Sequence, residues 1–350
     1  MKRLLQFFAF LFLLLIAFVA HTLTSTGYFR DIEPHFDGEI VQKIKIVGAE
    51  DMTINKAESF MLISSDDRAA TKKGKPKQGG IYWMDLQEEA PFEAKLISGN
   101  FKEPFHPHGI SLLQLDSVNY KLWVINHVNG KHSVEVFHLQ GDSLTHLQTL
   151  KHEKMISPND ILAVGEETFY FTNDHTYLSK MGSLVEGYLG LAAANVMYFD
   201  GGNYRMAADG IAYANGINWD EKRNLLFVAA ARGFLLKVYQ KAANGDLTFV
   251  EDIDCHTGVD NIEVDSKGDL WIGAHPSLMA YTAYADFKED KAPSEILKMR
   301  YKSKGDHTIE SVFLDDGSNM SGSSVATTNG EYLFLGNVMD PHILIVKAED

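Results

Sequence analysis

The chain has 350 residues, of which 45% are hydrophobic, and it carries a formal net charge of −15 at pH 7. This acidic balance and the lack of a basic stripe argue against a nucleic-acid partner. The only cysteine, Cys255, excludes an intrachain disulfide. Because Cys255 precedes a predicted strand, we expect it to be a small packed residue and not a nucleophile.

Residues 1–30 predict an export signal. A basic start precedes an apolar stretch at 4–20, whose length lies between a signal-peptide core and a full membrane span. Cleavage after Ala20 would put Phe18 where a small side chain is required, which favours an uncleaved signal anchor over a cleaved signal peptide. Both alternatives predict an extracytoplasmic body, either secreted or membrane-anchored by its N-terminus. The apolar segment is a candidate for contact with a membrane or lipid surface.

Residues 31–350 are predicted to form a single domain of six repeats. Short apolar strands recur at residues 59–65, 121–127, 168–174, 224–230, 269–275 and 331–337. A repeat of about 50 residues, with about four short strands and hairpin signals such as Asn129-Gly130, is typical of propeller blades. The sequence therefore predicts an all-β, six-bladed β-propeller with a central channel, plus an N-terminal hydrophobic helix.

Two segments depart from the repeat. Residues 72–80 are polar and rich in lysine and glycine, which indicates a solvated hairpin loop or a mobile lid over the channel mouth. Residues 177–194 are apolar enough to form a short helix between the third and fourth repeats. That helix could pack on one face of the ring, or contact a membrane or the substrate.

A polar residue precedes each repeated strand, at the level where the innermost strand of a blade would line the channel. In chain order these residues are Glu50, His108, Asn159, Asn215, the pair Asp260 and Asn261, and the pair Ser323 and Ser324. Four repeats thus offer carboxylate or amide oxygens at one level. Calcium prefers six to eight hard oxygen ligands, whereas no histidine-rich or thiolate set of the kind that binds zinc occurs at this level. The pattern predicts a calcium ion in the channel.

Asp51 and Asp160 each follow a ring residue and should point away from it, because side chains alternate along a strand. They are either the ligands of a second, structural calcium or two buried turn aspartates. His108 lies at the ring level, and His127 lies in the same repeat. They are either a pair of imidazoles that removes a proton from water or structural residues. No Gly-x-Ser-x-Gly or His-Glu-x-x-His motif occurs, which argues against a serine hydrolase or a zinc protease.

Several segments, in the same order, resemble the paraoxonase family of calcium-dependent arylesterases and lactonases. They include residues 48–51, 107–111, 159–161, 214–218, 259–262 and 322–326. The resemblance extends from about residue 40 to the end of the chain. One departure is the family's disulfide between the ends of the chain, which cannot form with Cys255 alone.

The resemblance implies a role for each matching residue. The ligands of a catalytic calcium would be Glu50, Asn159, Asn215, Asp260 and Asn261. The ligands of a structural calcium would be Asp51, Asp160 and the backbone carbonyl of Ile110. His108 and His127 would form a catalytic histidine dyad, and Asp174, His175 and His275 would be further active-site residues.

The implied function is hydrolysis of small aryl esters and lactones, with a channel-bound calcium as Lewis acid and the dyad activating water. Two alternatives remain. The first is a membrane-tethered, non-enzymatic assembly factor with a structural calcium. The second is a sugar lactonase similar to regucalcin.

Overall fold

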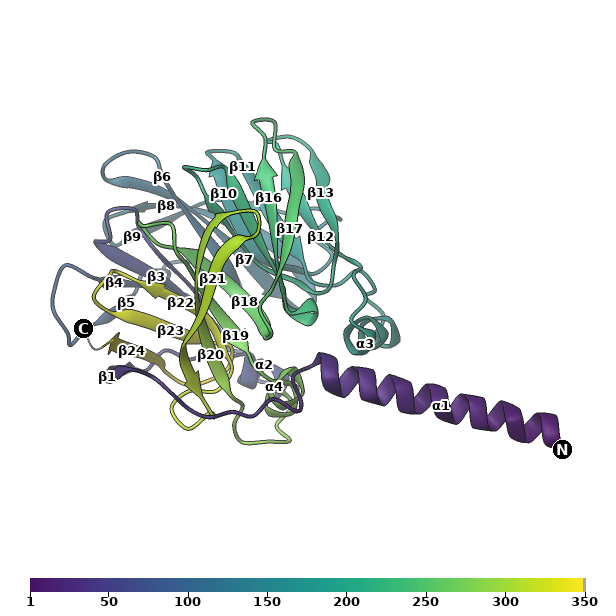
Figure 1. Ribbon diagram of the computed structural model, residues 1–350. Coiled ribbons are helices and arrows are strands. Elements are labelled where there is room, and N and C mark those ends of the chain that lie inside the picture. The colour runs from purple at the N-terminus through teal and green to yellow at the C-terminus, as the bar shows by residue number, and fades with distance from the viewer. Residues whose placement is uncertain (349–350) are drawn as a thin grey trace.

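Each of the six repeats contributes to a four-stranded antiparallel sheet, and the six sheets surround a central axis (Figure 1). The computed structural model describes residues 1–348. The prediction of an all-β, six-bladed β-propeller preceded by an apolar helix is confirmed.

Five sheets are built from consecutive strands. The first contains β2 (Ala49–Ile54), β3 (Phe60–Ser65), β4 (Gly80–Asp85) and β5 (Ala94–Leu96). The second contains β6 (Pro107–Gln114), β7 (Asn119–Val128), β8 (Lys131–Gln140) and β9 (Ser143–Leu150). The third contains β10 (Pro158–Gly165), β11 (Thr168–Asn173), β12 (Ala194–Phe199) and β13 (Tyr204–Ile211). The fourth contains β14 (Ala214–Asp220), β15 (Leu225–Ala230), β16 (Leu235–Lys241) and β17 (Leu247–Asp254). The fifth contains β18 (Gly258–Val264), β19 (Leu270–His275), β20 (Ser294–Ser303) and β21 (Asp306–Asp315).

The sixth sheet joins the two ends of the chain. It contains β22 (Ser323–Thr328), β23 (Leu333–Asn337), β24 (Ile343–Ala348) and, on its outer edge, β1 (Gly38–Ile44). The pairing of β1 with β24 is antiparallel and runs from Gly38 opposite Ala348 to Ile44 opposite Ile343. Strand pairing therefore closes the ring, while Cys255 is buried as a free thiol.

The repeated apolar strands are the second strands of the sheets, namely β3, β7, β11, β15, β19 and β23. Neighbouring sheets cover both of their faces, so these strands are apolar without strict alternation. All six residues of β3 and all five of β23 are buried. Between the second and third sheets, Trp123 and Phe169 belong to one hydrophobic cluster. This packing leaves the first strand of each sheet to line the axis.

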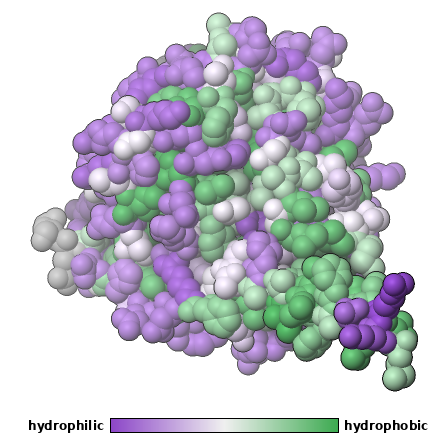
Figure 2. Space-filling model, turned by 45° about the vertical axis from the view of Figure 1, so that its right-hand side comes forward, coloured by the Kyte–Doolittle hydropathy of each residue, from purple (hydrophilic) through white to green (hydrophobic). Residues whose placement is uncertain are grey.

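Helix α1 (Lys2–Ser25) projects from the propeller (Figure 1) and buries only Thr22. Among residues 1–348 it is the one helix long and apolar enough to cross a membrane. Helix α3 (Lys180–Leu189) confirms the helix predicted within residues 177–194. It lies beside α1, where the Thr22 hydroxyl donates to the carbonyl of Tyr188 at 3.4 Å. Figure 2 shows hydrophobic surface gathered where α1 comes forward.

The short helices α2 (Arg68–Lys72) and α4 (Leu278–Ala285) lie near the C-terminal end of α1 (Figure 1), and η1 (Ala231–Gly233) follows β15. The amide of Leu278 donates to the carbonyl of Thr26 at 2.9 Å, which joins α4 to the end of α1. The Lys72 ammonium donates to the carbonyl of Ala285 at 2.9 Å. The lysine-rich segment predicted as a loop therefore begins at the end of α2 and contacts α4.

Candidate active site

The inner strand of every sheet is irregular at the level of the predicted ring. The register with the second strand shifts at residues 49–51, 107–110, 158–161, 214–217, 259–262 and 323–325. Such bulges leave residues outside the ladder and turn their side chains to new directions. They also need close backbone packing: a Cβ on Gly109 would lie 2.5 Å from Asp160 Cα, and one on Gly216 would lie 2.5 Å from the Asp260 carbonyl. The bulges present the ring residues to the channel.

The five predicted ligands of the catalytic ion share one feature. Each is at most 5% exposed and has a buried side-chain oxygen without a hydrogen-bond partner. These atoms are Glu50 Oε2, Asn159 Oδ1, Asn215 Oδ1, Asp260 Oδ1 and Asn261 Oδ1. Leaving a buried acceptor without a hydrogen bond costs about 1–3 kcal/mol. These five oxygens are a large part of all buried side-chain N and O atoms that lack a hydrogen-bond partner in residues 1–348. These unpaired acceptors make the channel level a candidate site for a cation.

The donor set suits calcium chemically. It combines two carboxylates with three amide oxygens, all of them hard ligands of the kind calcium prefers. Within residues 1–348, no three His, Cys, Asp or Glu side chains gather closely enough to hold a metal ion by themselves, so the asparagine amides are an essential part of this donor set. The residues present fit a calcium ion, because the amides supply ligands without adding charge.

Three side chains contact the carboxylate of Glu50. Asn261 Nδ2 donates to Glu50 Oε1 at 3.0 Å, His108 Nε2 lies 3.3 Å from the same oxygen, and Arg68 lies 3.7 Å from Oε2. Burial alone would raise the pKa of Glu50, but His108 and Arg68 outweigh it and lower the pKa to about 2. Burial raises the pKa of Asp260 above its ordinary value, although His275 donates to it at 2.9 Å. Glu50 is thus held ionised.

His108 and His127 meet as predicted, and a third histidine extends the pair. His127 Nε2 lies 3.1 Å from His108 Nδ1, and His127 Nδ1 lies 2.7 Å from His132 Nδ1. Burial, and then the neighbouring His108 and His132, lower the pKa of His127 well below its ordinary value. His127 is therefore a neutral imidazole in a row that leads away from Glu50.

The other predicted active-site residues hold ring residues in place. Asp174 accepts from Nδ2 of Asn159 at 3.4 Å and pairs with Nδ1 of His175 at 2.8 Å. Burial alone would lower the pKa of His175, but Asp174 outweighs it and raises the pKa. His275 is 3% exposed and stacks on Tyr281 with ring centres 4.0 Å apart. These contacts orient Asn159 and Asp260.

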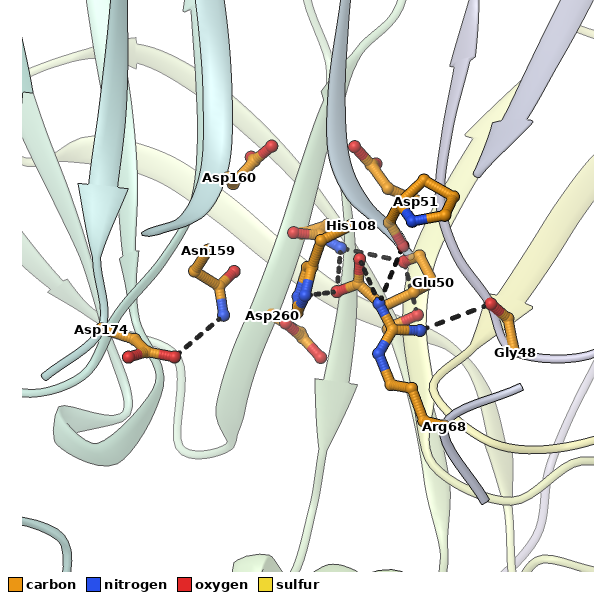
Figure 3. Close-up of polar contacts among 12 residues, drawn as sticks. Gly48, Glu50, Asp51, Arg68, His108, Asn159, Asp160, Asp174 and Asp260 are labelled. Atoms are coloured by element: carbon orange, nitrogen blue, oxygen red, sulfur yellow. Dashed lines mark hydrogen bonds and ion pairs between the residues drawn. The ribbon is translucent and has the colours of Figure 1, made fainter. Parts of the chain in front are cut away.

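Asp51 and Asp160 lie on one side of the ring level, and Arg68 and Asp174 lie on the other (Figure 3). Each of the two aspartates accepts two backbone amides, among them Ile110 N to Asp51 at 2.7 Å and Ile217 N to Asp160 at 2.7 Å. Burial raises the pKa of both, and so do neighbouring carboxylates. They line a cavity of about 860 Å³ on the far side of the channel, together with Glu263. Two buried carboxylates in one cavity are a hard-oxygen donor set.

Sequence reasoning missed four residues of the site: Arg68, His132, Tyr213 and Glu263. Arg68 and His132 lie outside the repeated motif. Tyr213 contacts the ring of His175 and has a φ of +62°, an uncommon value for a residue with a side chain. Glu263 accepts from Nδ2 of Asn218 at 3.0 Å. Only the alternation along β18 could have indicated that Glu263 faces the channel.

The fold and the ring define a class: six-bladed β-propellers with a hard-oxygen centre in the channel. The Arylesterase family model matches residues 37–344, so the chain belongs to the arylesterase (paraoxonase) family. It is 36% identical over 298 residues to human "Serum paraoxonase/arylesterase 1", with 83% of each chain covered. The mouse protein of that name is 37% identical over 324 residues, with 90% of each chain covered. Arylesterases are carboxylic ester hydrolases, and the chain falls in this enzyme class.

Solved structures with little sequence identity share the fold. A luciferin-regenerating enzyme superposes with a TM-score of 0.52 at 11% identity, covering 87% of this chain and 92% of its own. Regucalcin from Agrobacterium tumefaciens superposes with a TM-score of 0.50 at 11% identity, covering 90% and 96%. At this identity the comparison supports the propeller fold alone.

Proposed function

We propose that this protein is a calcium-dependent hydrolase of aryl esters and lactones. The observation that carries the proposal is the set of five unpartnered buried oxygens at the channel axis. Membership of the arylesterase family supports the reaction class. Glu50 and Asp260 provide two negative charges and the three asparagines provide neutral oxygens, a combination that suits a divalent cation.

Calcium, when bound by these five residues, supplies a Lewis acid for the negative charge that develops on the carbonyl oxygen. His108, with His127 behind it, accepts the proton of the attacking water. His275 and Asp174 hold Asp260 and Asn159 in their orientations through the contacts described above. A second, structural calcium is assigned to Asp51, Asp160 and the carbonyl of Ile110.

We further infer that α1 and α3 face a membrane or lipid surface and that the propeller is extracytoplasmic. The exposed apolar side chains of α3 include Met181, Leu184 and Val185. They lie beside an exposed apolar α1. Burying such side chains in lipid is favourable by roughly 1.5–3 kcal/mol each when complete. The two helices together favour retention of α1 as an anchor.

The proposal is tested with the purified full chain in detergent, on a panel of phenyl acetate, aliphatic lactones of several chain lengths and sugar lactones. We expect hydrolysis of phenyl acetate and the aliphatic lactones, loss of activity with a calcium chelator and recovery when calcium is added back. If the protein hydrolyses none of these substrates at saturating calcium, the proposal is contradicted and the assembly-factor alternative is favoured. Hydrolysis confined to sugar lactones favours the regucalcin-like alternative.

A further inference from the structure

A third histidine stands behind the pair at the ring. His132 is the second residue of β8 and the cross-strand partner of His127 in β7. The two rings are almost perpendicular, at 89°, with centres 4.8 Å apart. Their Nδ1 atoms are 2.7 Å apart, which is a hydrogen-bond distance. His132 is half-buried, so the row runs from buried Glu50 to solvent-accessible His132.

The position of each hydrogen along the row follows from Glu50. A carboxylate only accepts hydrogen bonds, so the 3.3 Å approach of His108 Nε2 to Glu50 Oε1 favours a hydrogen on Nε2. A neutral imidazole has one donor and one acceptor, so His108 Nδ1 accepts from His127 Nε2. By the same rule His127 Nδ1 accepts from His132 Nδ1, which leaves His132 Nε2 as a free acceptor. In this inward set every N–H points toward Glu50.

His108 can accept a proton at Nε2 only in the opposite, outward set. There His108 Nδ1 donates to His127 Nε2, and His127 Nδ1 donates to an acceptor at residue 132. Both sets contain three ring hydrogens, so exchange between them needs no additional charge, but the outward set gives up the contact of a His108 N–H with Glu50. Mixed sets place two N–H groups or two lone pairs face to face and lose a buried hydrogen bond, which costs about 1–3 kcal/mol.

We propose that His132 is a positioning residue that donates or accepts at Nδ1 and so keeps His127 and His108 in matched tautomers. Its importance for turnover rests on the proposed hydrolase function. Its effect on the tautomers does not, because the row is present in the protein itself. A side chain without a polar atom at this point leaves His127 Nδ1 buried and unpaired in both sets.

The test compares His132→Phe with His132→Asn. Phenylalanine keeps a ring but removes both nitrogens, whereas an asparagine amide can donate or accept near the position of His132 Nδ1. We expect kcat for phenyl acetate to fall by about 10- to 100-fold in His132→Phe with KM unchanged, the range for residues that orient active-site groups. His132→Asn should recover most of kcat. His138→Phe, a second half-buried histidine on β8, serves as the matched control and should change neither value.

Nitrogen-15 NMR of histidine-labelled protein gives a readout that does not depend on activity. In the wild type, Nδ1 of His127 should have the signal of a hydrogen-bonded acceptor, assigned by its loss in His127→Gln. His132→Phe should shift this signal to that of an unbonded nitrogen, and His132→Asn should preserve it. If the phenylalanine variant does not fold, His132→Ala takes its place.

Three outcomes overturn the proposal: wild-type kcat in His132→Phe, an unchanged His127 signal in His132→Phe, or equal loss of kcat in the Asn and Phe variants. A wild-type protein that hydrolyses no ester defeats the proposed function instead. The NMR comparison then still tests the role of His132.

Discussion

The proposed cation at the channel axis rests on individual side-chain oxygen atoms that are buried without a hydrogen-bond partner. Asn215 is one example: it is 5% exposed, and its Oδ1 has no hydrogen-bond donor within residues 1–348. Such an atom lowers the free energy of unfolding of the ion-free protein, because it is buried without a hydrogen bond. It raises the free energy of unfolding of the ion-bound protein, because it then binds the ion. The same residue should therefore affect stability in opposite directions with and without calcium.

Replacing Asn215 by leucine removes this unpaired amide at similar volume. With a chelator present, we expect the free energy of unfolding to rise by about 1–3 kcal/mol, the cost of an unpaired buried polar group. With calcium present, the stabilisation by calcium should fall, because one ligand is lost. Denaturant unfolding with calcium and with chelator measures both effects.

Asn203→Leu is the control for this experiment, since Asn203 is exposed in a turn. Its effects should stay within about 0.5 kcal/mol. If Asn215→Leu keeps the full stabilisation by calcium, Asn215 is not a ligand.

Spacing along the chain indicated the ring residues but could not indicate their contacts. Glu50, Asn159 and Asn215 recur at one level because each repeat begins with an inner strand. Arg68 reaches Glu50 from a short helix in a connection, and His132 reaches His127 across a hairpin. Contacts of this kind depend on register and on side-chain direction, which periodicity does not specify.

Among the elements, α1 and α3 are joined to the propeller by one buried side chain. Arg232, in η1, is 9% exposed and donates to the carbonyls of Ser25 and Gly187 at 2.8 and 2.7 Å. It therefore satisfies carbonyls at the ends of both helices. The sequence indicated both helices through their apolar residues, but it did not indicate that one arginine holds them together.

Replacing Arg232 by methionine keeps the aliphatic stem and removes these donors. We expect a loss of about 1.5–3 kcal/mol, the worth of hydrogen bonds to a charged group, and faster proteolytic cleavage within residues 176–192. Limited proteolysis and denaturant unfolding measure the two effects. Arg300→Met is the control, because the Arg300 side chain is 63% exposed and its ion pair lies on the surface. Equal cleavage rates in both variants would show that Arg232 does not secure α3.

At the scale of the whole molecule, the ring is closed by hydrogen bonds between β1 and β24. A propeller needs this closure because an open first or last sheet would expose strand edges. Glu39 and Lys347 are cross-strand partners at the closure. Cys255 is buried, and burial raises the pKa of its thiol to about 12, so it should not compete with an engineered disulfide.

The double variant Glu39→Cys/Lys347→Cys should form a disulfide that stabilises the oxidised protein by up to about 5 kcal/mol, since the closed loop contains nearly the whole propeller. The denaturant midpoints of oxidised and reduced samples give the difference. The single variant Glu39→Cys should show no such difference. An oxidised double variant without added stability would contradict the expectation that linking β1 to β24 stabilises the ring.

The sequence by itself determined the number of blades, the strands that form the core and the oxygen-bearing residues that begin the inner strands. Strands buried on both faces must be apolar throughout, and oxygen donors must start the inner strands, so both leave a pattern in the chain. Only the tertiary structure decided that six bulges leave five oxygens unpaired, that three histidines form one row and that Arg232 joins two helices. Those features arise where strands, helices and connections from different parts of the chain meet, and their geometry depends on packing.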